Sequence, residues 1–378
     1  MKKIACCTMA MLLLSSCNSK TEENYSLAEN YDNIYVAEYA DNYLNGRIVD
    51  GSADGNVNTP AAYVDYNTME KTILCSKPNC VHNNTSCPAN VMGTAPILTE
   101  NSIYYFDVSY GVVEKKYGVK ELEIKSRLVK MALDTAEIET IAEFNDCVPD
   151  NSRGFILYNN RIYFTGDDFA PTTDEYGGFF YSNIGGTHYL CSIDLETGEY
   201  INYGNIYDDK MYEGANCSSS ARILGIYNSK MIINYEFCKT LEDAASANFT
   251  ELVFEFDFDT NQMTLTDIQS IPVYVDSDTI IYNDYDINKC VVIDKGNRFE
   301  LDIGEVTLAS LLNNKLFVRD DKNNYALKWY DLSDMSEHHV KDYDGFMPVS
   351  IYYESYILTK GNKTVKLTEK DLLASDEE

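Results

Sequence analysis

The feature that most constrains the fold is a short phrase that recurs along the chain and ends on a fixed 37-residue spacing. Each copy reads as an extended segment, an acidic or polar turn and a second extended segment, as in EFDFDTNQM at 255–263. The aligned third positions are separated by 67, 62, 63, 37, 37 and 37 residues and are Asp65, Ala132, Asp194, Asp257, Asp294, Asp331 and Thr368. A fixed period of this length indicates a repeat architecture.

A second phrase, an aliphatic residue usually followed by Tyr or Phe, precedes the first one. Its copies are Ile34-Tyr35, Ile103-Tyr104, Ile162-Tyr163, Met231-Ile232, Ile280-Ile281, Leu316-Phe317 and Tyr356-Ile357. Several are preceded by residues that tolerate the left-handed conformation of tight hairpins, namely Asn159-Asn160, Asn228-Ser229 and Asn313-Asn314. The two phrases together predict four antiparallel strands per unit, which is the size of a propeller blade.

The sequence therefore predicts an all-β fold, a single β-propeller over 31–372 of four-stranded blades. Seven blades fit best, and six or eight stay open. A pair of β-sandwiches has no reason to keep a 37-residue spacing. The longer early units predict insertions, expected as loops, at 76–93, 145–151, 166–187 and 204–220. We expect a strand near 25–27 to complete the last blade and close the ring.

The charge balance limits the class of partner. With 30 Lys and Arg against 60 Asp and Glu, the net charge is −30, which argues against a nucleic-acid partner. The 31 Tyr favour β structure. Because acidic residues recur in the turns of the repeat, we interpret most of the charge as an aid to solubility.

The N-terminus reads as an export signal. Lys2 and Lys3 precede a 13-residue apolar or small run, too short to span a bilayer, that ends in LSSC at 14–17. This ending resembles a bacterial lipobox, which implies a signal peptide over 1–16, cleavage before Cys17 and acylation (diacylglyceryl and palmitate) of that residue. Residues 17–30 would be a polar tether and 373–378 an acidic tail. The alternative is an ordinary secretory signal. The predicted location is the cell membrane, facing the extracytoplasmic side.

The lipobox, the repeat phrases and the segment LCSKPNCVH at 74–82 together resemble an uncharacterised group of bacterial β-propeller lipoproteins. The repeats are similar to those of the low-density-lipoprotein-receptor-like propeller class. The receptor-type Tyr-Trp-Thr-Asp signature and the sialidase Asp-box are absent from the sequence, so the resemblance implies a fold and a location and brings no activity or ligand.

Four potential metal ligands occupy thirteen residues of the first insertion. Cys75, Cys80, His82 and Cys87 follow the spacing C-x4-C-x-H-x4-C, and three thiolates with an imidazole are a closed ligand set for zinc. Exported proteins commonly pair their cysteines instead, so a Cys75–Cys80 disulfide, with Cys87 reaching Cys147 or another loop, is the competing prediction. Unpaired thiols are the third. Each alternative makes the cluster a structural feature of the loop.

We predict no catalytic residues. The sequence has no G-x-S-x-G elbow, P-loop or H-E-x-x-H motif, and its acidic loops do not match the calcium-binding D-x-[DN]-x-[DN]-G pattern. The most suggestive binding segment lies in the third insertion, where aromatic and acidic residues are candidates to contact a sugar ring or a protein. These candidates are Phe169, Asp174, Tyr176, Phe179, Phe180 and Tyr181. The alternative is that 179–181 form another core strand.

Two functional hypotheses follow. The first is a surface-tethered, non-enzymatic propeller that binds a protein, peptide or glycan of the envelope. The second is a secreted glycan-active lyase or hydrolase with carboxylates in the propeller channel.

Overall fold

The structure is a computed structural model, and the residues that it describes are almost entirely β-strands and turns. They are 35–36, 46–49, 62–65, 71–73, 75, 79–81, 87, 97–99, 102–114, 120–132, 137–150, 155–167, 170–173, 179–182, 187–207, 219–240, 242–243, 246, 248–268, 270–303, 306, 309–320, 326–340, 347–352, 355–360, 363–368 and 371. The predicted signal peptide, Cys17 and the acidic tail lie outside these residues, as does the strand expected at 25–27. Within the described part, no helix is long and apolar enough to cross a membrane.

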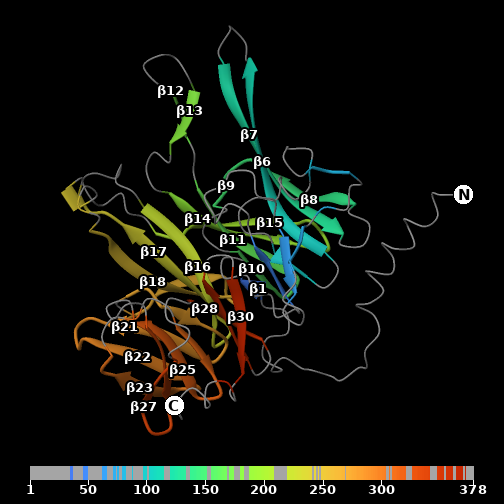
Figure 1. Cartoon of the computed structure of the whole chain (residues 1–378). Coiled ribbons are helices and arrows are strands. Elements are labelled where there is room, and N and C mark those ends of the chain that lie inside the picture. Colours follow the sequence, from blue (N-terminus) through green and yellow to red (C-terminus); the bar gives the residue numbers. More distant parts are fainter. Residues whose placement is uncertain are drawn as a thin grey trace, which may run out of the picture.

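Antiparallel sheets follow one another along the chain, and we number seven of them, sheets 1 to 7 (Figure 1). Sheet 1 contains β2 (Gly46–Val49), β3 (Ala62–Asp65) and β4 (Lys71–Ile73), and sheet 2 contains β5 (Ile97–Leu98), β6 (Ser102–Glu114), β7 (Lys120–Ala132) and β8 (Ile138–Phe144). Sheet 3 contains β10 (Phe155–Tyr158), β11 (Arg161–Asp167), β14 (His188–Asp194) and β15 (Tyr200–Asn205), with β1 (Tyr35–Val36) beside β10 and β9 (Val148–Pro149) beside β11.

The remaining four sheets have the same antiparallel pattern. Sheet 4 contains β16 (Ser219–Tyr227), β17 (Lys230–Phe237), β18 (Thr250–Asp257) and β19 (Gln262–Leu265), and sheet 5 contains β20 (Tyr274–Val275), β21 (Thr279–Asp284), β22 (Lys289–Asp294) and β23 (Asn297–Leu301). Sheet 6 contains β24 (Ala309–Leu312), β25 (Lys315–Asp320), β26 (Ala326–Asp331) and β27 (Ser336–His339), and sheet 7 contains β28 (Met347–Tyr352), β29 (Ser355–Lys360) and β30 (Lys363–Thr368).

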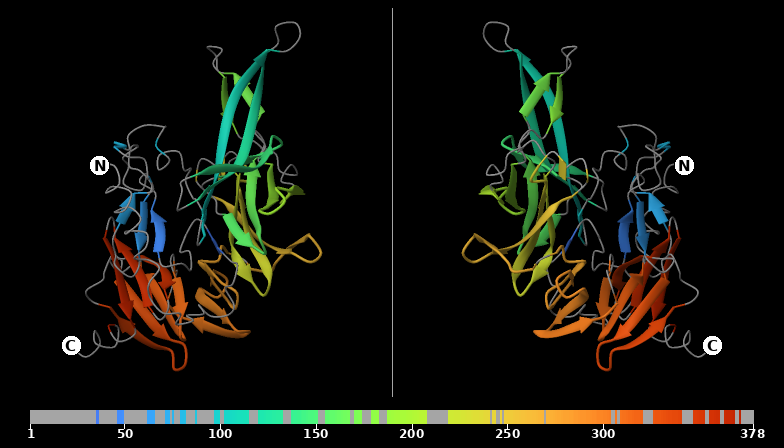
Figure 2. Two further views of the ribbon diagram at one scale, coloured as in Figure 1. Left: turned by 90° about the vertical axis from the view of Figure 1, so that its right-hand side faces the viewer. Right: turned by 90° about the vertical axis from the view of Figure 1, so that its left-hand side faces the viewer.

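The sequence repeat coincides with the sheets. Each of the seven aligned positions, from Asp65 to Thr368, is the last residue of the corresponding strand in its sheet, namely β3, β7, β14, β18, β22, β26 and β30. The first sheet also lies beside the last one (Figures 1 and 2). The predicted β-propeller of antiparallel blades is therefore confirmed, and the number of blades stays a prediction.

The predicted tight turns are present. Asn159 and Asn160 have φ values of 47° and 61°, and the equivalent pairs Asn228-Ser229 and Asn313-Asn314 have 49° and 59° and 48° and 66°. Two consecutive positive φ values are the mark of a type I′ turn, whose twist matches that of the strands it joins. These turns connect the first and second strands of sheets 3, 4 and 6.

The acidic residue of the repeat has a structural role in the next turn. Asp194 Oδ1 accepts hydrogen bonds from the backbone N–H groups of Glu196 and Thr197, at 3.0 and 2.9 Å, and from the Thr197 hydroxyl at 3.0 Å. Asp257 repeats this arrangement with Asp259 and Thr260. The hydrogen bonds, first of all those from the backbone, lower the pKa of both carboxyl groups. Part of the negative charge therefore stabilises turns between the third and fourth strands.

Two expectations about the early units were wrong. Ile34-Tyr35 was predicted to belong to the first unit, but Tyr35 lies in β1, which pairs with β10 of sheet 3, and β2 pairs with β3 in the first sheet instead. Most of the extra residues of the second unit were predicted in loops. They lengthen β6 and β7 instead, whose thirteen pairs run from Ser102↔Ala132 to Glu114↔Lys120.

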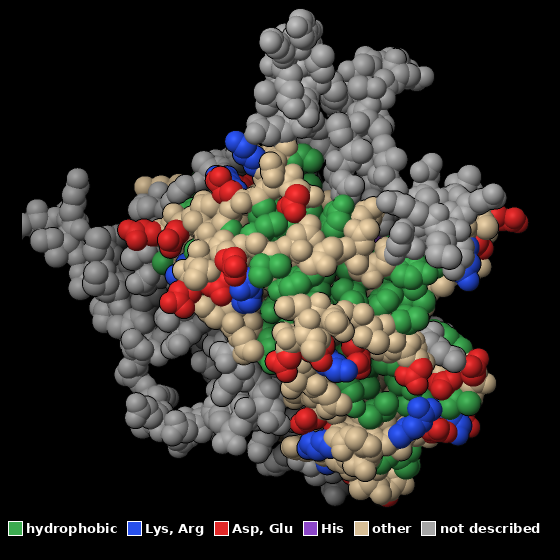
Figure 3. Space-filling view, turned by 180° about the vertical axis from the view of Figure 1, so that it is seen from behind, with side chains coloured by type: hydrophobic (Ala, Val, Ile, Leu, Met, Phe, Trp, Pro, Cys, Tyr) green, Lys and Arg blue, Asp and Glu red, His purple; other side chains and the backbone are tan. Residues whose placement is uncertain are grey.

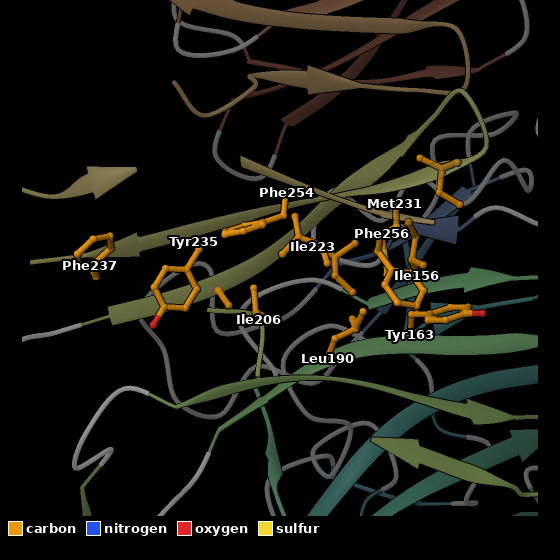
Figure 4. Packing of buried hydrophobic residues seen from close by; sticks show 13 residues of the cluster. Ile156, Tyr163, Leu190, Ile206, Ile223, Met231, Tyr235, Phe237, Phe254 and Phe256 are labelled. Atoms are coloured by element: carbon orange, nitrogen blue, oxygen red, sulfur yellow. The ribbon is translucent and has the colours of Figure 1, made fainter. Parts of the chain in front are cut away.

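The core lies between neighbouring sheets. Sheets 2 and 3 share a buried cluster that includes Phe106, Phe144 and Phe164, with Phe164 ring-centroid distances of 4.6 Å to Phe106 and 5.5 Å to Phe144. Sheets 3 and 4 share a second cluster, shown in Figure 4, in which Tyr163 faces Phe256. Clusters of the same kind join sheet 5 to sheet 6 and sheet 6 to sheet 7.

Sheets 4 and 5 are also in close contact. A Cβ atom added to Gly225 of β16 would lie 2.9 Å from the Cβ of Val275 in β20, so only glycine fits there. Each sheet from 2 to 6 is therefore packed against the next one along the chain, as a propeller requires.

We expect Phe164→Ala to lower the free energy of unfolding by about 3–5 kcal/mol, because the ring is fully buried between two sheets and leaves a cavity that neither can fill. Urea titration of the variant measures this loss. Leu265→Ala is the matched control, since that side chain is 54% exposed and should change stability by less than about 0.5 kcal/mol. Equal losses in the two variants would contradict the assignment of the core.

Candidate functional site

The four predicted insertions leave the described sheets at one end. In an antiparallel sheet of four strands, the connection from second to third strand and the connection to the next sheet lie at the same end. The predicted insertions at 76–93, 145–151 and 204–220 are connections to the next sheet, and 166–187 joins the second strand to the third. We call this the insertion end. The opposite end carries the short Asn and Asp turns described above.

Two hairpins project side by side from the insertion end (Figures 1 and 2). One is the outer part of β6–β7 in sheet 2. The other consists of β12 (Ala170–Thr173) and β13 (Phe179–Ser182), a two-stranded sheet separate from the blades. Both occupy the connection between second and third strands, in neighbouring blades, which explains why they project together.

The predicted binding segment forms this second hairpin in part. Phe179, Phe180 and Tyr181 lie in β13 and pair with Thr173, Thr172 and Pro171 of β12. They are therefore in a strand, as one alternative predicted, but in the projecting hairpin and not in a blade. The other predicted residues of the segment, Phe169, Asp174 and Tyr176, lie outside the described residues.

A buried polar chain holds the root of the β12–β13 hairpin. Asp167 ends β11, His188 begins β14, and the two residues are the last pair of that ladder. His188 Nδ1 lies 2.5 Å from Asp167 Oδ1, and His188 Nε2 lies 3.0 Å from Ser219 Oγ. In the neutral imidazole, Nδ1–H donates to the carboxylate and Nε2 accepts from the hydroxyl.

This chain, which we call the root triad, links two insertions. Asp167 and His188 flank the insertion that carries β12–β13, and Ser219 follows the insertion between sheets 3 and 4. A second bond, from the Thr165 hydroxyl to the Ala221 carbonyl at 3.2 Å, joins the same two sheets nearby. His188 packs edge-on against Tyr235, with ring centroids 5.5 Å apart. The arrangement fixes the ends of β11 and β14, between which the hairpin is inserted, against sheet 4.

The root triad has the acid–imidazole–hydroxyl order of a hydrolase, but its environment argues for a structural role. A catalytic imidazole must exchange protons with a substrate. The His188 residue is only 1% exposed, and both ring nitrogens are occupied by the neighbours just described. Sequence reasoning missed these residues because Asp167, His188 and Ser219 belong to no spacing motif, and only the strand pairing brings them together.

A pair of buried thiols lies next to the root. Cys147 Sγ is 3.7 Å from Cys191 Sγ, and the Tyr200 hydroxyl is 3.5 and 3.3 Å from the two sulfur atoms. The hydrogen bond with Cys191 and burial raise the pKa of Cys147 far above that of a free thiol. Cys147 therefore adjoins Cys191, and both belong to the buried cluster between sheets 2 and 3.

Three of the four predicted metal ligands converge. The sulfur atoms of Cys75, Cys80 and Cys87 all lie within 4.8 Å of one another. Cys87 is fully buried, and the other two are partly exposed. His82 lies outside the described residues. The three cysteines belong to the connection between sheets 1 and 2, which starts at the insertion end.

Charge is spread over the surface. On the face seen in Figure 3, acidic side chains alternate with Lys and Arg over the described residues and do not gather into one patch. Pairs such as Lys230 with Glu255 at 2.7 Å, and Lys328 with Glu337 at 2.9 Å, belong to this pattern. This distribution agrees with charge that serves solubility.

We expect Asp167→Ala to cost about 1–3 kcal/mol of stability, because it leaves a buried imidazole N–H without an acceptor. The same variant should be cleaved faster by a protease between residues 168 and 187. Asp167→Asn keeps an acceptor oxygen and should lose less on both measures. Urea titration and timed proteolysis with mass spectrometry test this, and wild-type behaviour of Asp167→Ala would show that the triad does not hold the hairpin.

Comparison with known proteins gives weak similarities only. No family model and no curated protein matches the chain. Among solved structures, the uncharacterized protein lmo1340 of Listeria monocytogenes EGD-e is 9% identical over 71% of this chain and 72% of its own, with a TM-score of 0.38. The oligogalacturonate lyase of Vibrio parahaemolyticus is 9% identical over 85% of each chain, with a TM-score of 0.30. The WD40 domain of SCAP from fission yeast is 9% identical over 89% of this chain and 94% of its own, with a TM-score of 0.24. Scores this low carry no functional argument, and the propeller assignment rests on the sheets and their repeat.

Proposed function

We propose that the chain is a lipid-anchored, extracytoplasmic propeller that binds a protein, peptide or glycan of the envelope through its insertion end. The observation that carries this proposal is the difference between the two ends of the sheets. One end of the described sheets has short turns, and the other carries the four predicted insertions together with two projecting hairpins. Loops and hairpins on a rigid scaffold are the usual place for recognition.

The rigidity of the hairpin root supports the proposal. The root triad and the Thr165–Ala221 hydrogen bond hold the ends of β11 and β14, between which β12–β13 is inserted, against sheet 4. An insertion with both ends fixed loses less conformational freedom when it binds than one with free ends, so more of the contact energy remains as affinity. Aromatic residues such as those of β13 suit contacts with sugar rings or protein side chains.

The location rests on the N-terminal sequence. The 13-residue apolar run and the LSSC ending predict export and acylation at Cys17. A tether of about a dozen polar residues would then separate the propeller from the membrane. We do not propose a hydrolase at the root triad, since its imidazole is enclosed by protein.

Replacing residues 168–187 with Asn-Gly tests the role of the β12–β13 hairpin. Asp167 and His188 are cross-strand partners, so a two-residue type I′ turn joins them without disturbing the blade. We expect a folded protein that captures at least tenfold less ligand. The measurement is cross-linking on intact cells followed by mass spectrometry, together with binding to an immobilised glycan set.

The matched control is the same replacement in the next blade. Phe237 and Thr250 end the equivalent ladder of sheet 4, and Asn-Gly in place of 238–249 removes a connection whose described residues form no hairpin. This variant should keep wild-type capture. If the β12–β13 replacement and a β6–β7 hairpin shortened to the pair Val108↔Ser126 both retain full capture, the insertion end is not the binding surface.

We expect Cys17→Ala to release the protein from membranes, because the acyl chains would be its only anchor. Fractionation and intact-mass measurement after detergent extraction follow the change. Cys7→Ala, in the apolar run of the same signal, is the matched control and should leave the protein in the membrane fraction. Retention of the Cys17→Ala protein would contradict the lipid anchor while leaving the binding proposal intact.

A further inference from the structure

The three-sulfur cluster of Cys75, Cys80 and Cys87 carries an inference independent of the proposed function. These side chains come from three places along a connection between blades. Cys75 lies two residues beyond β4, and its N–H donates to the Ile73 carbonyl at 2.8 Å. Cys80 follows Asn79, whose φ of 60° turns the chain back, and Cys87 is fully buried. The fold brings the three sulfur atoms together although the cysteines do not belong to a common strand.

The presence of three sulfur atoms in the cluster favours a metal site over a disulfide. A disulfide joins two sulfur atoms at about 2.05 Å and gives a third no reason to approach both. A tetrahedral zinc centre has Zn–S bonds of about 2.3 Å, which places its sulfur ligands about 3.8 Å apart. The observed limit of 4.8 Å for all three pairs accommodates that geometry.

Zinc also suits the charge of this ligand set. Cysteine binds zinc as the thiolate, and Zn²⁺ bound to three thiolates leaves a net charge of only −1. Soft sulfur ligands select zinc over calcium or magnesium, which prefer oxygen. Cys87 provides the buried side of the site, and the partial exposure of Cys75 and Cys80 provides a route for the ion to enter.

We propose that Cys75, Cys80 and Cys87 bind one zinc ion, which fixes the connection between sheets 1 and 2. The connection lies outside the repeat, and its described residues, 75, 79–81 and 87, are in no strand, so a metal centre would take the place of the packing that the blades give one another. His82 is the sequence-predicted candidate for a fourth ligand, and the proposal depends on the three sulfur atoms alone. The centre is structural, since it holds a loop at the insertion end.

Metal analysis of the full chain, extracted from membranes with detergent and without added chelator, is the first test. We expect about one zinc per chain, and less than a tenth of that in Cys75→Ser. Cys238→Ser, outside the cluster, is the matched control and should keep its zinc. Zinc content that is the same in Cys75→Ser and wild type would overturn the proposal.

Thiol mapping of the wild-type protein gives a second test that does not depend on a variant folding. Iodoacetamide should label Cys75 at least tenfold faster after a zinc chelator has been added, with re-addition of zinc chloride restoring protection. Replacing the metal with Co²⁺ should produce the intense absorption of a tetrahedral thiolate complex. A zinc-free chain in which non-reducing peptide mapping finds a disulfide between two of the three cysteines would establish the oxidative alternative and exclude the metal site.

Discussion

Burial between neighbouring sheets is the constraint on which the rest of this structure depends. A four-stranded antiparallel sheet has two faces, and because the described residues contain no long helix, each face is covered by another sheet. Phe106, Phe144 and Phe164 meet between sheets 2 and 3 for this reason, and Trp329 and Leu358 lie in the cluster between sheets 6 and 7. The abundance of aromatic residues follows, because large flat side chains fill the wedge between twisted sheets with few residues.

Packing of this kind leaves the two ends of the sheets free to differ. The short-turn end is held by local chemistry, with left-handed Asn pairs in one set of turns and Asp carboxylates accepting backbone N–H groups in the other. These turns have no room for insertions, since the residues that form them also set the register of the strands. Insertions at the other end do not disturb the strands of the blades. Both hairpins and the three-sulfur cluster lie in connections at that end.

The sequence anticipated what the repeat governs. The seven aligned positions all end the corresponding strand, and the Asn pairs have the backbone angles expected of them, because strand period and turn chemistry are local properties. It failed where distant residues meet. The pairing of β1 with β10 and the root triad of Asp167, His188 and Ser219 depend on which strands and blades are neighbours. The spacing of residues along the sequence does not show this. The convergence of Cys75, Cys80 and Cys87 was predictable because all three lie in one short segment.

The insertions need a different source of stability from the blades. A residue inside a blade is fixed by two neighbouring sheets, whereas a segment that leaves the ring has water on most sides and little apolar area to bury. Such a segment must instead be held by local interactions among a few residues. The Asp167–His188–Ser219 chain is one, buried where the β12–β13 hairpin leaves sheet 3, and it stabilises because each member has a partner. The three-sulfur cluster is the other, where the proposed zinc ion would fix three points of the connection between sheets 1 and 2 at once. Both occur where the repeat is interrupted, so these connections contain chemistry that the repeat itself does not.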